Sequence, residues 1–228
     1  MVFKLSVPVL FLFMSALGLA QNSGLQWARA MDALPATGQR SVSADPAGNV
    51  LFAGYFEGTI QLNSGTDTIT FSSRGNTDIF IVKTDPFGTI LWAKQIGSPQ
   101  PDYGFAAATD RHGNCYIAGY FQESADFDPG PGVHELSSAG FFDVFILKLD
   151  SGGNYQWARS FGSENNDFAY AVAVDTQGSV FTAGWFVGEV DLDPGTGSAF
   201  FMSEGIADAF IQKLDSAGNF VWGRTFGG

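Results

Sequence analysis

Hydrophobic and polar residues recur along this chain in short runs that are typical of β-strands rather than helices. Within one stretch four such runs follow one another, at 103–110, 114–121, 143–150 and 154–162. The second run, NCYIAGYF, is almost continuously apolar, as expected for a strand that is covered on both faces. The fourth run alternates with a period of two, which predicts a half-buried edge strand. Its residues expected on one face are Tyr155, Trp157, Arg159 and Phe161.

The runs are joined by a short turn pattern, Asp-x-x-Gly, which occurs six times. The pattern begins at Asp45, Asp85, Asp110, Asp150, Asp175 and Asp215. An aspartate can accept backbone hydrogen bonds at the start of a turn, and glycine adopts a positive φ without steric cost. The pattern therefore predicts antiparallel hairpins between the first and second strands and between the third and fourth.

The whole arrangement repeats with a period of 65 residues, without insertion or deletion. Its clearest markers are Trp27, Trp92, Trp157 and Trp222. A strict period of this kind indicates a repeat architecture, and four antiparallel strands per unit predict all-β β-propeller blades. A β-sandwich array and a β-solenoid are the rival folds, but sandwich modules are usually longer and solenoid coils shorter. The residues beyond an ordinary blade are predicted to form hairpin-like excursions at 57–77, 122–142 and 187–207.

The N-terminal segment has the features of a secretory signal peptide. Lys4 precedes an apolar run from Leu5 to Met14. The small residues Gly18 and Ala20 occupy the two positions that a signal peptidase recognises at its cleavage site. Cleavage is expected after Ala20. The rival interpretation is a membrane anchor, but the apolar run is short for a bilayer and no basic flank follows it. Export to the medium or the cell surface is therefore predicted, with no membrane span after cleavage.

The repeat divides the rest of the chain into an incomplete unit and three blades. The expected organisation is a signal peptide at 1–20, an orphan fourth strand at 21–32, and blades at 33–97, 98–162 and 163–228. Ring closure needs at least four blades. The three repeats are therefore expected to form an open arc or a fragment of a larger propeller, which self-associates or continues into further blades.

Composition narrows the choice of partners. The 228 residues include 23 acidic and 11 basic side chains, for a net charge of −12. Such a surface disfavours nucleic acid and anionic membranes and is compatible with cations. Cys115 is the one cysteine, so no intrachain disulfide can form, and it is expected to be a small buried side chain.

Two acidic loops are the candidate metal sites. ADFDPGPG places Asp126 and Asp128 on one strand face, and VDLDPGTG does the same with Asp191 and Asp193. Paired carboxylates beside a turn could hold Ca²⁺, which takes six to eight oxygen ligands. The competing interpretation, which we favour, is a Pro-Gly turn with solvated acids, because the first unit has lost these acids. No other cofactor is predicted.

The recurring aromatic residues have both a binding and a structural interpretation. Each repeat pairs a tryptophan with a nearby cation, as in Trp157 and Arg159, which suggests either a platform for sugars or packing between blades. Aromatic doublets also recur, at Tyr55-Phe56, Tyr120-Phe121 and Trp185-Phe186. Recurrence at fixed steps inside strands favours packing for both. His112 and His134 occupy different loops, so neither a catalytic triad nor a zinc site is predicted.

Taken together, the run D-x-F-[IV]-x-K-x-D-x-x-G-x-x-x-W-[AG]-[KR], the D-x-x-G-N hairpin and the D-[FL]-D-P-G loop resemble bacterial secreted β-propeller repeat proteins of the SBBP type. The resemblance covers 24–228. It implies a secreted or cell-surface repeat module that is a non-catalytic binding or structural scaffold for an extracellular glycan or protein. The alternative is part of a polysaccharide-active propeller hydrolase or lyase, which would need one blade with unique acids or a histidine.

Overall fold

The computed structural model describes residues 32–64 and 67–228, and all regular secondary structure in these residues is β-strand. The expected signal peptide at 1–20 lies outside the described residues. So does the expected orphan strand at 21–32, except for Asp32, which begins β1. Within the described part no helix is long and apolar enough to cross a bilayer.

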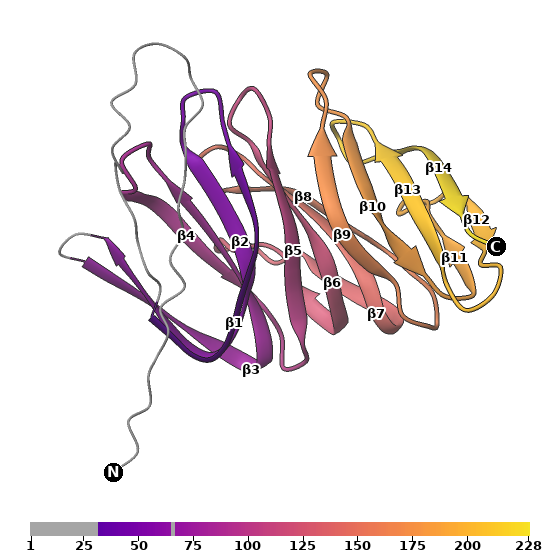
Figure 1. Cartoon of the computed structure of the whole chain (residues 1–228), viewed down its shortest axis with the longest axis horizontal. Coiled ribbons are helices and arrows are strands. Elements are labelled where there is room, and N and C mark those ends of the chain that lie inside the picture. Colours follow the sequence, from indigo (N-terminus) through magenta and orange to yellow (C-terminus); the bar gives the residue numbers. More distant parts are fainter. Residues whose placement is uncertain (1–31, 65–66) are drawn as a thin grey trace.

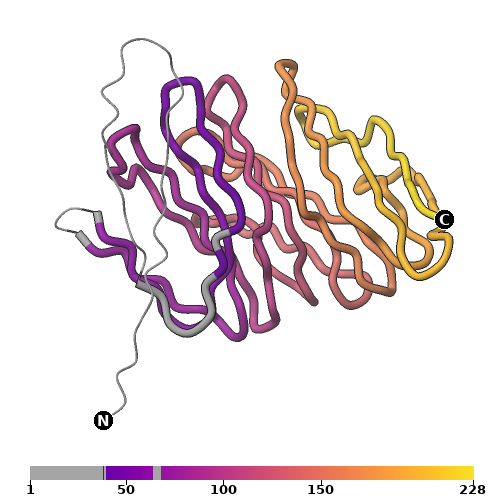
Figure 2. Tube along the Cα trace, viewed as in Figure 1, coloured from indigo at the N-terminus to yellow at the C-terminus, as the bar shows by residue number. Residues whose placement is uncertain are grey.

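The strands form three four-stranded antiparallel sheets, which follow one another in chain order along the long axis of the molecule (Figures 1 and 2). The first sheet contains β1 (Asp32–Ala44), β2 (Val50–Ser64), β3 (Asp67–Thr84) and β4 (Ile90–Ile96). The second contains β5 (Asp102–Thr109), β6 (Cys115–Asp126), β7 (Glu135–Leu149) and β8 (Tyr155–Phe161). The third contains β9 (Phe168–Val174), β10 (Val180–Phe186), β13 (Asp208–Leu214) and β14 (Phe220–Phe226). The predicted all-β class with four antiparallel strands per sheet is confirmed.

The six Asp-x-x-Gly turns all have the predicted geometry. In the turn that joins β5 to β6, Asp110 Oδ1 accepts backbone hydrogen bonds from His112 and Asn114 at 2.8 and 3.0 Å. Gly113 closes the turn with a φ of 77°. The glycines of the other five turns have φ values between 79° and 83°. A side chain at these positions would strain the backbone, which explains why the glycine recurs.

The surplus residues extend the two central strands of each sheet as hairpins. In the first sheet Thr59–Ser64 pair with residues 67–72, which lengthens both β2 and β3. In the second sheet residues 124–126 pair with 135–137. In the third the extension is a separate two-stranded sheet of β11 (Glu189–Asp191) and β12 (Phe200–Met202). The expected hairpin-like excursions are confirmed.

The sheets pack face to face, and the first strand of one sheet lies against the preceding sheet. Thus β5 contacts β1, β2 and β3, and β9 contacts β5, β6 and β7. Ile117 and Phe145 belong to the core between the first and second sheets, whereas Tyr116 and Ile146 belong to the core between the second and third. The central strands of the second sheet are therefore covered on both faces, as their apolar sequence predicts.

The fourth strand of the second sheet departs from simple alternation. Trp157 pairs with Lys148 and Tyr155 with Leu149, so Gln156 is an extra residue in a β-bulge. Because of this extra residue, the residues of β8 before the bulge lie on the opposite face from the one that simple alternation predicts. Trp157 enters the core between the second and third sheets, whereas Tyr155 packs against the core between the first and second. The prediction that Tyr155 shares a face with Trp157 is therefore wrong.

The recurring tryptophans join each sheet to the next. Trp92 Nε1 donates a hydrogen bond to the carbonyl of Ser151 at 3.0 Å, in the turn between β7 and β8. Trp157 Nε1 donates to Ser216, in the corresponding turn of the third sheet, at 3.2 Å. Each indole lies over the turn glycine, so a Cβ on Gly153 would lie 2.8 Å from the Trp92 ring. The structural interpretation of these tryptophans is therefore confirmed at both junctions.

Candidate functional site

The first strand of every sheet carries a β-bulge at the same position of the repeat. The extra residues are Arg40, Phe105 and Tyr170, because the pairing with the second strand shifts at each of them. A bulge leaves its extra residue outside the ladder and re-aims the side chain. The Arg40 guanidinium carbon lies 5.2 Å from the Phe105 ring centre, which is 5.1 Å from that of Tyr170. The three bulges thus align side chains from β1, β5 and β9.

Further rings extend this alignment into a continuous row across the three sheets. We call the aromatic row Tyr55, Tyr103, Phe105, Tyr120, Phe142, Phe168, Tyr170 and Trp185. From Tyr55 the contacts pass to Tyr103 and then to Tyr120, with ring centres 4.8 and 4.9 Å apart. From Tyr120 they continue to Phe168 at 4.4 Å, and Phe168 lies 4.5 Å from Trp185. Ring pairs at these separations stabilise one another beyond their apolar burial.

The rings of the aromatic row are only partly buried. Tyr170 is 43% exposed, and the other seven are intermediate between buried and exposed. The three strands that carry the bulges lie side by side across the molecule (Figure 1). The row is therefore a rigid, partly exposed aromatic surface, which is the combination that a binding site requires.

The first repeat contributes a cation to the row instead of two rings. Gly38 and Arg40 stand where the second repeat has Tyr103 and Phe105. A Cβ at Gly38 would lie 2.6 Å from the Tyr55 ring, so only glycine lets that ring lie against β1. Arg40 donates a hydrogen bond to the Tyr55 hydroxyl and lies 5.2 Å from the centre of that ring. This end of the row can therefore recognise acceptors or anionic groups.

Four of the eight rings in the row are tyrosines, namely Tyr55, Tyr103, Tyr120 and Tyr170. Burial raises the pKa of Tyr120, and the neighbouring Tyr170, Tyr103 and Tyr55 raise this pKa further, while Arg40 lowers it. Tyr120 is therefore a neutral hydrogen-bonding group at neutral pH. The row thus combines apolar ring faces with tyrosine hydroxyls and the guanidinium of Arg40.

The aromatic doublets are divided between the core and this surface. Phe56, Phe121 and Phe186 are fully buried, as predicted. The packing interpretation is incomplete for Tyr55, Tyr120 and Trp185, which belong to the partly exposed row. Sequence reasoning also missed the aromatic residues of the first strands. The signal was present, because Tyr103-x-Phe105 and Phe168-x-Tyr170 recur at the repeat step.

The acidic loops use their carboxylates to shape their own backbone. Asp126 Oδ1 accepts hydrogen bonds from the backbone amides of Asp128 and His134, at 3.0 and 2.8 Å. Asp191 makes the same contacts with Asp193 and Ala199, at 3.0 and 2.7 Å. No group of three or more His, Cys, Asp or Glu side chains in the described residues is placed to hold a metal ion. Calcium binding by these loops stays a prediction that only a direct measurement tests.

We expect Ca²⁺ to change the melting temperature only slightly, because these carboxylate oxygens already accept backbone hydrogen bonds. A ligand that binds only the folded state raises the melting temperature. Any rise, of about 2–4 °C at most, should disappear in an Asp128→Ala plus Asp193→Ala variant. A Glu164→Ala plus Glu204→Ala variant removes the same charge elsewhere and should keep it. An equal rise in all three proteins would exclude the loops as the calcium site.

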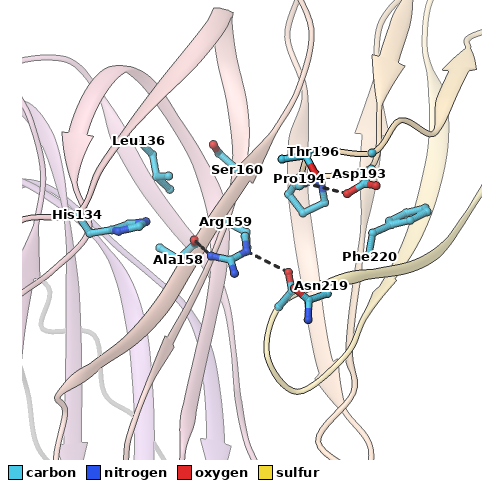
Figure 3. Close-up of a pocket in the computed structure, with 13 residues that line it drawn as sticks. His134, Leu136, Ala158, Arg159, Ser160, Asp193, Pro194, Thr196, Asn219 and Phe220 are labelled. Atoms are coloured by element: carbon cyan, nitrogen blue, oxygen red, sulfur yellow. Dashed lines mark hydrogen bonds between the residues drawn. The ribbon is translucent and has the colours of Figure 1, made fainter.

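A cleft of about 450 Å³ lies between the second and third sheets (Figure 3). His134, Ser160 and Asp193 are among its polar lining residues. Arg159 crosses it and donates to the carbonyls of Gly218 and Ala158 at 3.1 and 2.9 Å. The polar contacts of Arg159 thus fasten the two sheets together, and the cleft is the gap beside this junction.

The other chemically reactive side chains lie apart from one another. His112 lies in the turn between β5 and β6, and the His134 ring packs 5.0 Å from the Tyr155 ring. Cys115 is fully buried, as expected, and burial raises the pKa of its thiol to about 12. A thiol with such a pKa is a poor nucleophile at neutral pH.

Comparison with known proteins gives distant relatives. No family model matches this chain. It is 28% identical over 164 residues to the uncharacterized WD repeat-containing protein L264 of Acanthamoeba polyphaga mimivirus. It is 25% identical over 157 residues to the regulatory protein FlaEY of Caulobacter vibrioides. These alignments cover 62% and 64% of this chain but only 12% and 16% of the relatives' length.

A solved structure of a Bacteroides caccae protein of unknown function aligns with 88% of this chain and 85% of its own, at 11% identity and a TM-score of 0.28. The repeated four-stranded antiparallel sheets, packed one on the next in chain order, give a β-propeller-like repeat fold.

Proposed function

We propose that this protein is an exported, non-catalytic scaffold that binds a protein partner through the aromatic row. The observation that carries the proposal is the alignment of Arg40, Phe105 and Tyr170 by three equivalent bulges. Neighbouring sheets thereby present a cation and two rings in one line. The partner is expected to cross the three first strands, because the row runs from sheet to sheet.

The chemistry of the row supports a protein partner. Tyrosine, tryptophan and arginine are the residues that most often dominate the binding energy of protein interfaces. Their rings here are already packed against one another, so little side-chain entropy remains to be lost on binding. Arg40 adds a permanent charge at one end, which would select a complementary acidic or carbonyl-rich segment.

The repeat architecture supports a scaffold role. Each sheet is fastened to the next by equivalent contacts, so the row rests on a rigid frame. A relative named as WD repeat-containing shares part of this sequence. Export rests on the predicted signal peptide at 1–20 and on the resemblance to secreted propeller repeats.

Affinity capture with matched variants tests this proposal. The chain would be used to capture binding proteins from the extracellular fraction of the cells that produce it, and a captured partner would then be purified and titrated. An Arg40→Ala plus Tyr170→Ala variant should bind at least about tenfold more weakly, as expected when two interface anchors are removed. Both side chains are exposed or partly exposed, so the variant should fold normally.

A Phe87→Ala plus Phe200→Ala variant is the matched control, because these side chains are 79% and 62% exposed elsewhere on the surface. It should bind the partner like wild type. Unchanged affinity in the Arg40 and Tyr170 variant would refute the role of the row. Binding on a glycan array that is lost in the same variant would instead identify the row as a glycan platform, and the protein-partner proposal would be wrong.

A further inference from the structure

Two buried aspartates meet where the second sheet packs on the third. Asp143 lies in β7 and is 3% exposed, and Asp167 directly precedes β9 and is 0% exposed. Both carboxyls lie against the peptide that joins Gly162 to Ser163. A Cβ on Gly162 would overlap the Asp143 carboxyl, and Asp167 Oδ2 accepts a hydrogen bond from the Ser163 amide at 2.6 Å. The two acids are therefore close neighbours at one junction.

Each of these two carboxyls has one oxygen without a partner. Asp143 Oδ2 accepts from the Ala139 amide at 2.9 Å, and Asp167 Oδ2 also accepts from the Ser163 hydroxyl at 2.8 Å. The Oδ1 atoms of both acids are buried and have no hydrogen-bond partner among the described residues. Neither acid forms a salt bridge in that part of the chain. Because an unpaired buried carboxylate is costly, these oxygens point to a ligand from outside the chain.

The equivalent acid pair at the first junction, Asp78 and Asp102, is supplied with partners by the chain itself. Gln95 Nε2 donates to Asp78 Oδ2 at 2.7 Å, and the Arg74 amide donates to Asp78 Oδ1 at 3.1 Å. The Arg74 guanidinium donates to the Gly97 carbonyl at 2.9 Å. Burial raises the pKa of Asp78, and the charge of Arg74 counteracts this rise. A cation and an amide thus stand beside the first pair.

The second junction lacks both of these side chains. Ala139 occupies the repeat position of Arg74, and Ser160 occupies that of Gln95. The counterpart of the Gly97 carbonyl is that of Gly162. Ala139 is exposed and Gly162 is partly exposed, so a small ion can approach this place from solvent. The second junction therefore has the acids and the carbonyl of the first without its cation.

We propose that a small divalent cation, Mg²⁺ or Mn²⁺, binds to Asp143 Oδ1, Asp167 Oδ1 and the Gly162 carbonyl, with water completing its coordination. Two carboxylates balance the charge of one divalent ion, and carboxylate, carbonyl and water oxygens are the ligands that these ions take. Mg²⁺ commonly binds through one or two carboxylates and keeps several waters. Ca²⁺ is less suitable, because it takes six to eight oxygens and both Oδ2 atoms already accept hydrogen bonds.

The cation would join the two sheets directly behind the aromatic row. Phe142 precedes Asp143 and Phe168 follows Asp167, and these two rings of the row have centres 5.7 Å apart. The Asp167 amide also donates to the Phe142 carbonyl at 2.7 Å. A bound ion would therefore hold the start of β9 against β7 at the point where both strands contribute rings to the row.

Thermal melting of chelator-treated protein at pH 8 tests the site, because both carboxyls are then mostly ionised. Mg²⁺ at about tenfold above its dissociation constant should raise the melting temperature by about 3–6 °C, since it binds only the folded state. Ca²⁺ should raise it less. Asp143→Asn and Asp167→Asn should each abolish the response to Mg²⁺. Asp150→Asn is the matched control, because it removes a carboxylate of the same sheet from a turn, and it should keep the response.

An exchange of junction residues provides a second test that leaves both acids in place. Ala139→Arg plus Ser160→Gln gives the second junction the partners of the first. This variant should melt at a higher temperature than wild type without metal, and it should no longer respond to Mg²⁺. Isothermal titration calorimetry should likewise detect Mn²⁺ binding to wild type and none to the variant.

The proposal would be overturned by a wild-type protein that does not respond to Mg²⁺, or by a response that persists in the asparagine variants or in the exchanged variant. A larger response to Ca²⁺ that is lost in Asp143→Asn would overturn the assignment of a small cation.

Discussion

Replacing Lys83 by alanine is expected to lower the free energy of unfolding by about 3–5 kcal/mol, the usual result of breaking a buried ion pair. The Lys83 side chain is 1% exposed and its ammonium lies 3.1 Å from Asp45 Oδ2. The same ammonium donates to the carbonyl of Gly113 in the next sheet at 2.8 Å. The substitution therefore removes the cation that neutralises a buried carboxylate, which keeps only its hydrogen bonds from Ala47 and Asn49, and it removes the ammonium donor of the Gly113 carbonyl. Urea denaturation followed by tryptophan fluorescence measures the loss.

The repeat offers a matched control for this substitution. Lys213 occupies the same position two repeats later, but the pair that it forms with Asp175 is 25% and 28% exposed and spans 3.8 Å. Exposed pairs contribute about 0–1 kcal/mol, so Lys213→Ala should cost no more than that. Comparable losses for the two variants would show that the buried position of Lys83 does not determine its contribution.

The stability of the folded chain is expected to fall as the pH rises from about 4 to 7. Burial raises the pKa of Asp102 and Asp143 to about 7 and that of Asp167 to about 6, compared with 3.8 for an ordinary aspartate. The repulsion of Asp78 adds to the shift of Asp102, and that of Asp167 to the shift of Asp143. In each pair one acid lies in the third strand of a sheet, and the other begins or directly precedes the first strand of the next sheet.

The sign of the effect follows from proton binding. The folded state binds these protons more tightly than the unfolded chain does. Their stabilising contribution is complete below the unfolded pKa of about 3.8 and is lost as the pH rises through the folded values. Each pKa unit corresponds to about 1.4 kcal/mol, so the loss is on the order of 3–5 kcal/mol per carboxyl. One buried oxygen of each of Asp102, Asp143 and Asp167 has no hydrogen-bond partner, as suits an uncharged carboxyl.

An Asp102→Asn plus Asp143→Asn variant should flatten this pH dependence. The amide is neutral at every pH, and the oxygen at position 102 can still accept the hydrogen bond from the Ser98 amide. The variant should therefore melt at a higher temperature than wild type at pH 8 and at a similar temperature at pH 5. Asp150→Asn is the control, because hydrogen bonds from Asn154 hold the pKa of Asp150 low. Melting curves of wild type with no decline between pH 5 and 8 would contradict the assignment.

Much of the fold could be predicted because its determinants are local and recur. A turn that begins with Asp110 and ends with Gly113 has the same requirements wherever it lies, so six copies predict six hairpins. The 65-residue step of the tryptophans predicts equivalent packing contacts, and Trp92 and Trp157 make them. The candidate site was harder to predict from the sequence. The side chains of the aromatic row come from three repeats, and within each repeat they have the pattern of structural residues.

The sequence by itself determined the strands, the hairpins and the sheet repeat, since these depend on alternation, on turn residues and on a constant period. Only the tertiary structure decided which face each side chain occupies. One extra residue in a strand reverses every face beyond it, and no local pattern announces the bulges at Arg40, Phe105, Gln156 and Tyr170. The packing of one sheet on the next then determined which groups surround each side chain. It placed Arg40 beside rings from two sheets, buried Lys83 and left Lys213 partly exposed. Contacts between residues far apart in the chain depend on how whole sheets meet, and this is why they could not be read from the repeat.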